Sequence, residues 1–108
     1  MDFKVIFRDT FLEDLELVVR SIAARNPAAA RKLGELIISA SESLSFFPER
    51  HPRVRQRPGI RRLIVKKYFK VFYRVRRRDS TVEILRCWDG RRGSEPPMRW
   101  SESVGAAA

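Results

Sequence analysis

Hydrophobic and polar positions change their period several times along the chain, and each period predicts one element. Over residues 3–8, large apolar side chains alternate with their neighbours, which predicts a strand with one strongly apolar face. Between residues 12 and 22 the apolar positions repeat every three or four residues, which is typical of an amphipathic helix. Thr10 and Glu13 have the spacing of a capping box, so we expect Thr10 to cap this helix.

A second helix is predicted directly after the first. Asn26 is a favourable N-cap, and Pro27 suits the first helical position because the N–H that it lacks would have no partner there. Apolar side chains then recur at helical spacing from Ala30 to Leu44, and Pro48 breaks the pattern. Two helices joined by so short a link are expected to form an antiparallel hairpin.

The second half of the chain predicts strands. Residues 48–59 contain three prolines and a glycine with no apolar period, so we expect a loop there. Strands are predicted over residues 60–66, 68–76 and 81–88, with a polar turn at residues 77–80. The predicted order is therefore β-α-α-β-β-β. This is an α+β fold in which an antiparallel sheet has the helical hairpin packed on one face.

Length and composition indicate a single domain. The chain has 108 residues, and we expect one domain over residues 1–100 and a flexible tail over residues 101–108. The longest apolar runs are too short to cross a membrane, and the N-terminus lacks a signal-peptide pattern. A single cysteine cannot form an internal disulfide, so a cytoplasmic location is expected.

Charge separates the middle of the chain from its ends. The formal net charge is +10, with 23 Lys and Arg against 13 Asp and Glu. Residues 50–78 contain 13 Lys and Arg and no acidic side chain. Because apolar side chains are interleaved with these cations, the segment belongs to folded strands, and we expect it on the face of the sheet that the helices leave uncovered. It predicts either a surface that binds an anion or an acidic partner, or a solvated face.

The histidine and the cysteine carry little chemistry in this sequence. His51 lies in the predicted proline-rich loop, where we expect a solvated side chain rather than a catalytic base. Cys87 is expected to be a small buried residue of the last strand. One histidine and one cysteine do not form a zinc cluster, so we expect no metal and no cofactor.

Short motifs at six places along residues 3–92 resemble those of a known family. They are Glu13-Asp14-Leu15, Asn26-Pro27-x-Ala29-Ala30, Leu44-x-x-Phe47-Pro48, Gly59-Ile60-Arg61-x-Leu63, Tyr68-x-x-x-Phe72-Tyr73-Arg74-Val75 and Ile84-Leu85-x-x-Trp88-x-Gly90-Arg91-Arg92. In this order and at this spacing, the chain resembles the RelE/ParE superfamily, the small toxins of bacterial type II toxin–antitoxin modules. Proteins of this family are often labelled plasmid stabilisation proteins.

The resemblance implies one of two activities. RelE-like members cleave messenger RNA on the ribosome, using Lys and Arg on the sheet and a C-terminal tyrosine, whereas ParE-like members bind and inhibit DNA gyrase. The cations that match the ribonuclease positions are Arg61, Lys70, Arg91 and Arg92. At the place expected for the tyrosine the aromatic residue is Trp100, which has no ionisable hydroxyl. The sequence therefore favours the ParE-like activity, with the messenger RNA endoribonuclease as the alternative.

The resemblance also suggests where partners bind. The expected target-binding residues are Arg61, Arg62, Lys70, Arg74, Trp88, Arg91 and Arg92. Such cations bind phosphate and carboxylate equally well, so they do not discriminate between RNA and an acidic protein surface. A cognate antitoxin is implied, with an acidic amphipathic segment that covers the groove between helices and sheet. A further alternative is a non-toxic basic module that binds nucleic acid through counterion release.

Overall fold

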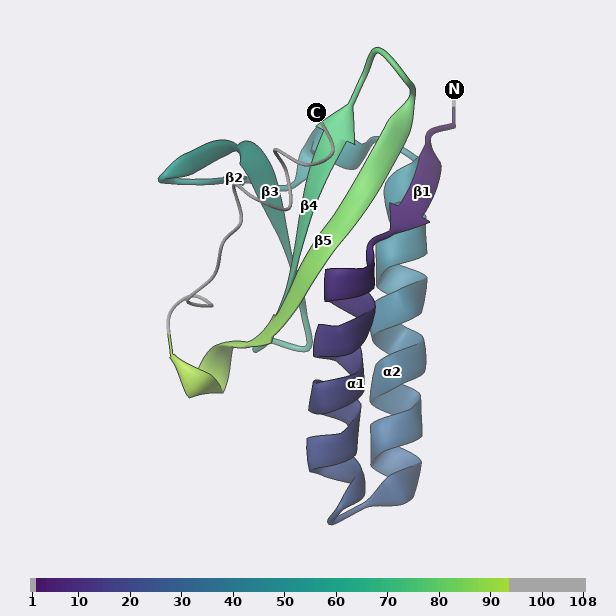
Figure 1. Cartoon of the computed structure of the whole chain (residues 1–108), viewed down its shortest axis with the longest axis vertical. Coiled ribbons are helices and arrows are strands. Elements are labelled where there is room, and N and C mark those ends of the chain that lie inside the picture. The colour runs from purple at the N-terminus through teal and green to yellow at the C-terminus, as the bar shows by residue number, and fades with distance from the viewer. Residues whose placement is uncertain (1, 94–108) are drawn as a thin grey trace.

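The computed structural model describes residues 2–93, in which a helical hairpin packs beside a five-stranded sheet (Figure 1). The helices are α1 (Asp9–Ala23) and α2 (Pro27–Glu42). The strands are β1 (Lys4–Phe7), β2 (Arg53–Val54), β3 (Arg57–Val65), β4 (Phe69–Arg76) and β5 (Thr81–Asp89). Single-turn 3-10 helices are η1 (Ser43–Ser45), η2 (Pro48–Arg50) and η3 (Gly90–Arg92). The tail predicted at residues 101–108 lies outside the described residues.

The two helices begin differently, and the sequence predicted one of the two starts. At α2 the side-chain oxygen of Asn26 accepts a hydrogen bond from the Ala29 N–H at 3.0 Å, and Pro27 is the first helical residue, as expected. The capping box predicted at Thr10 is wrong, because α1 already begins at Asp9 without a side-chain cap. The Thr10 hydroxyl instead donates to the carbonyl oxygen of Leu85 at 2.7 Å and so ties the helix to β5.

The strands follow the order β1-β5-β4-β3-β2 across the sheet. β4 is paired antiparallel to both β3 and β5, as predicted, but β1 is paired parallel to β5, so the sheet is mixed rather than antiparallel. The helical hairpin lies between β1 and the other strands in the chain, and a connection of that length permits either direction of pairing. The short edge strand β2 falls in the segment predicted as a loop.

The apolar side chains of the sheet form two clusters, one on each face, and a bulge in β5 interrupts the pairing with β4. Phe72 pairs with Arg86 whereas Tyr73 pairs with Ile84, so Leu85 is an extra residue on β5. Tyr73 is buried in the main core under the helices, while Phe72 and Leu85 belong to a smaller cluster. The members of that smaller cluster are Val54, Ile60, Phe72 and Leu85, with Trp88 packed against them. The uncovered face is therefore partly apolar, where the sequence suggested a basic face.

The main core joins both helices to the three central strands. It includes Phe11 and Ile37 from the helices and Val71, Tyr73 and Ile84 from the sheet, all fully buried. Cys87 is buried as predicted, and burial raises the pKa of its thiol to about 12. Within residues 2–93, neither helix combines the length and the apolar character that crossing a bilayer requires.

Candidate target-binding surface

Predicted site residues gather where the end of β5 meets the β3–β4 turn. Lys70 is the register partner of Trp88, and directly opposed residues of an antiparallel pair share one face of the sheet. Immediately after β5, the Gly90 N–H donates to the carbonyl oxygen of Tyr68 at 2.8 Å. This close approach brings the arginines that follow Gly90 against the start of β4. We call Tyr68, Lys70, Trp88, Arg91 and Arg92 the strand-end surface.

Arg91 is fixed at this surface by a carboxylate and two aromatic rings. Its guanidinium donates to both carboxylate oxygens of Asp89, at 3.0 and 2.8 Å. The same guanidinium lies 5.0 Å from the centre of the Tyr68 ring and 5.4 Å from that of Phe69, within cation–π range. The hydrogen bonds from Arg91 hold the pKa of Asp89 below its usual value. About half of the Arg91 side chain, 53%, stays exposed, so a fixed cation faces solvent.

Arg92 and Trp88 form a second pair of cation and ring. The Arg92 guanidinium lies 5.5 Å from the Trp88 ring centre. The indole N–H of Trp88 donates to the carbonyl oxygen of Gly93 at 3.2 Å, which orients the ring. Two arginines are thus held by stacking instead of extending freely, which lowers the entropy lost when a partner binds.

The β3–β4 turn adds two lysines beside this surface in an unfavourable backbone conformation. Lys66 and Lys67 are exposed and have positive φ angles of 50° and 73°, a region that favours glycine and asparagine. Backbone strain of this kind is found mainly at functional sites, because it persists only where the surrounding structure holds the residue in place. The turn therefore displays two cations at a cost in stability, next to Tyr68.

Arg61 was predicted in the same site, but the structure places it elsewhere. It is the register partner of Tyr73 and so lies on the face that the helices cover. Its guanidinium donates to the carbonyl oxygens of Glu49 and His51, at 3.1 and 2.8 Å. Arg61 thus supports the loop before β2, and its charged end is not directed to solvent as the sequence suggested.

Arg74 is likewise occupied in an ion pair away from the strand-end surface. Its guanidinium donates to Glu83, a residue with 0% of its surface exposed, at 2.8 and 2.5 Å. Arg8 pairs with the other oxygen of the same carboxylate. Burial raises the pKa of Glu83, but the hydrogen bonds from Arg8 and Arg74 outweigh it, and the net pKa is lowered. Arg62 lies on β3 opposite Phe72, a position between Lys70 and Arg74 along β4.

His51 is less solvated than the sequence suggested. It is partly buried, its ring centre is 6.4 Å from that of Tyr73, and desolvation lowers its pKa, helped by the nearby charge of Arg50. The lowered pKa favours the neutral imidazole at pH 7.

Tyr68 is the residue of this surface that the sequence did not indicate. Tyr68 precedes β4 in the chain, and the hairpin register pairs Phe69 with Asp89 and so places Tyr68 beside Arg91. Counting residues outward in both directions from the polar turn between β4 and β5 would have predicted that Tyr68 lies near the end of β5.

The fold and the strand-end surface define a small basic α+β domain with fixed, exposed cations at one end of its sheet. Residues 5–93 match the family model of the ParE toxin of type II toxin–antitoxin systems, parDE. The chain therefore belongs to this family and is a toxin component of such a system. No curated protein sequence matches the chain.

Solved structures share the fold. The chromosomal ParDE toxin–antitoxin system of P. aeruginosa gives a TM-score of 0.70 at 20% identity, over 81% of this chain and 95% of that one. The RelBE2 toxin–antitoxin complex of Mycobacterium tuberculosis gives 0.59 at 23% identity, over 88% of this chain and 95% of that one. At these identities the likeness establishes a common architecture.

Proposed function

We propose that this toxin acts by binding and inhibiting DNA gyrase, and that a cognate antitoxin with an acidic amphipathic segment neutralises it. The observation that supports this most is the arrangement of Arg91, held by Asp89 and by the ring of Tyr68. A preorganised, half-exposed arginine beside aromatic rings is a common anchor of protein interfaces.

RNA cleavage places a stricter chemical requirement on the same residues than binding does. A cleaving enzyme must stabilise a transition state that carries two negative charges on one phosphate. The carboxylate of Asp89 lies 2.8 Å from the Arg91 guanidinium and already offsets its charge, which makes Arg91 a poorer stabiliser of such a dianion. An interface contact tolerates this neighbour, because its requirement is a fixed donor geometry.

The messenger RNA endoribonuclease remains a second candidate for a specific reason. Tyr68, 44% exposed and stacked with Arg91, supplies a phenol next to the cations of the strand-end surface. A phenol can exchange a proton with a reacting oxygen, whereas the indole of the tryptophan at position 100 cannot.

A pair of assays with the purified protein separates these functions. Gyrase supercoiling is measured with increasing toxin, with and without the antitoxin encoded beside it, and ribosome-dependent cleavage of a messenger RNA is measured in parallel. We expect supercoiling to stop and the antitoxin to restore it, with the messenger RNA intact. Unchanged supercoiling together with messenger cleavage would replace the gyrase proposal with the ribonuclease. Neither activity, with salt-sensitive binding to nucleic acid, would point to the non-toxic module.

A further inference from the structure

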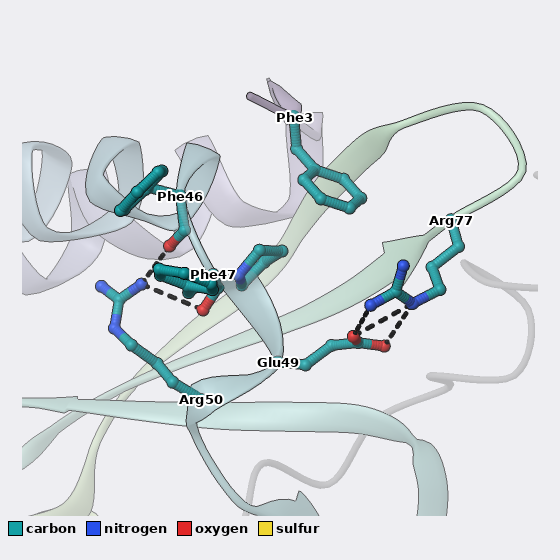
Figure 2. Close-up of a pocket in the computed structure, with 7 residues that line it drawn as sticks. Phe3, Phe46, Phe47, Glu49, Arg50 and Arg77 are labelled. Carbon is teal, nitrogen blue, oxygen red and sulfur yellow. Dashed lines mark hydrogen bonds and ion pairs between the residues drawn. The ribbon is translucent and has the colours of Figure 1, made fainter. Parts of the chain in front are cut away.

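An aromatic hollow lies beside the turn between η1 and η2 (Figure 2). Its volume is about 550 Å³, and its lining residues are Phe3, Phe46, Phe47, Pro48, Glu49, Arg50 and Arg77. Phe46 and Phe47 are 54% and 69% exposed, and their rings meet edge to face with centres 4.5 Å apart. Two adjacent, largely exposed phenylalanines leave apolar surface in water that a partner would bury. We call this the Phe46–Phe47 pocket.

The backbone at Phe47 is in the left-handed region, which an aromatic residue seldom adopts. Its φ and ψ angles are 47° and 56°. Such a conformation is unfavourable for a residue with a Cβ atom, and the ring remains 69% exposed here, so little burial offsets that cost. Strain and exposure together at one side chain indicate a role outside the folding of this chain.

The turn that carries the two rings is held rigidly. Arg50 donates to the carbonyl oxygens of Phe46 and Phe47, the latter at 3.2 Å, and to the Ser43 hydroxyl at 2.9 Å (Figure 2 shows the first two). The buried hydroxyl of Tyr73 donates to the carbonyl oxygen of Pro48 at 2.6 Å. The rings are therefore preorganised, which reduces the ordering cost when a partner binds.

Charge at the rim selects the kind of partner. Arg77 donates to both carboxylate oxygens of Glu49 at 2.5–3.2 Å, and its hydrogen bond holds the pKa of Glu49 below the usual value. Arg50 lies on the side of the turn that carries the phenylalanines, as Figure 2 shows. Since the lining contains two arginines and one glutamate, its net charge is positive. A second copy of a chain with net charge +10 would be repelled, whereas an acidic peptide would be attracted.

We propose that the Phe46–Phe47 pocket is a docking site for an acidic peptide segment that packs a large apolar side chain against the exposed surface of the two rings and places a carboxylate near Arg50 and Arg77. This proposal rests on the proposed function, in which the segment belongs to the antitoxin. The pocket is far from the strand-end surface, because Arg77 follows the end of β4 and Lys70 stands near its start. The two residues are seven positions apart along the chain, which corresponds to roughly 23 Å at ~3.3 Å per residue. A partner anchored here therefore need not compete for the residues that bind the target.

Phe47→Asn tests this, because asparagine is favoured in the left-handed region. We expect the variant to fold with unchanged or higher thermal stability, to inhibit its target as the wild type does, and to bind the antitoxin at least 10-fold more weakly. Binding is measured by titration calorimetry with the purified full-length protein encoded beside the toxin. Leu17→Ala is the matched control, since Leu17 is 57% exposed on α1 outside the pocket. Its affinity should equal that of the wild type.

Other outcomes count against the pocket. Equal affinity of Phe47→Asn and wild type would overturn it, as would an equal loss in Leu17→Ala or the absence of any binding by the wild-type toxin. Self-association of the wild type that Phe47→Asn abolishes, followed by sedimentation, would assign the pocket to a second copy instead. Antitoxin binding that depends on Phe47 in a toxin that leaves gyrase untouched would preserve the pocket and overturn only the gyrase proposal.

Discussion

The backbone N–H of Gly90 donates to the carbonyl oxygen of Tyr68 at 2.8 Å, and this bond attaches the end of β5 to the β3–β4 turn. A Cβ atom at Gly90 would lie 2.7 Å from that oxygen, closer than such atoms approach in proteins. The approach places the Arg91 guanidinium 5.0 Å from the Tyr68 ring. The strand-end surface therefore depends on a glycine that carries no chemistry of its own.

Gly90→Ala is expected to destabilise the protein by about 1–3 kcal/mol, because the backbone must separate or shift to admit the methyl group. The separation also moves Arg91 and Arg92, so target inhibition should weaken. Urea unfolding and the supercoiling assay measure the two effects. Gly59→Ala is the control, since a Cβ atom there meets nothing within 4 Å. Equal stability of the two variants would show that the Gly90 contact is unimportant.

Arg91→Ala distinguishes an interface residue from a catalytic one. In a gyrase inhibitor the change should weaken binding and inhibition together, by about 1–3 kcal/mol, because a fixed cation is lost from the interface. In a ribonuclease it should slow cleavage by roughly 100-fold while RNA binding stays nearly constant. We expect the first pattern, measured as gyrase affinity and supercoiling. Arg55→Ala removes an exposed charge from the segment between β2 and β3 and serves as the charge-matched control.

Arg61→Ala is expected to reduce stability more than target binding. Its guanidinium donates to the carbonyl oxygens of Glu49 and His51, and without it two partly buried acceptors lose their donor. The expected cost is about 1–3 kcal/mol in urea unfolding. The exposed Arg55→Ala should change stability by no more than about 0.5 kcal/mol. A fully stable Arg61→Ala protein that no longer inhibits gyrase would restore Arg61 to the target-binding surface.

Acid sensitivity should depend on Glu83. Its pKa in the folded protein is below the ordinary value of 4.5, so its ion pairs with Arg8 and Arg74 contribute stability at higher pH. That contribution is lost as the pH falls from about 4.5 through the lowered folded pKa. Glu83→Gln should cost about 3 kcal/mol at pH 7, near the low end for a buried pair because Arg8 is 43% exposed, and should flatten the curve of stability against pH below 5.

The comparison for Glu83 is Glu16→Gln, which removes one carboxylate of an exposed pair with Arg20 on α1. Such pairs contribute little, so its stability at pH 7 should stay within about 0.5 kcal/mol of the wild type. Melting temperatures between pH 3 and pH 7 measure both variants. If Glu83→Gln keeps the full acid sensitivity of the wild type, the pair with Arg8 and Arg74 is not its source.

Local patterns in the sequence were sufficient for most elements. The Asn26 cap, the two amphipathic helices and the antiparallel pairings of β4 follow from interactions between residues that are near in the chain or joined by a short turn. The burial of Cys87 followed from its place in an apolar strand. These features depend on the period of the apolar side chains and on turn length, both of which can be read directly from the sequence.

The order of residues was sufficient to predict the helices, the last three strands, the family and the excess of positive charge. The parallel pairing of β1 with β5, and the grouping of the cations, depend on contacts between residues that are distant in the chain. Arg61 supports a loop and Arg74 neutralises Glu83, whereas Arg91 and Arg92 stack on aromatic rings at the strand end. The reason is physical, since the two-residue period of a strand only assigns each side chain to one face of the sheet. The groups that each cation contacts on that face depend on the bulge at Leu85, the Gly90 contact and the buried carboxylates.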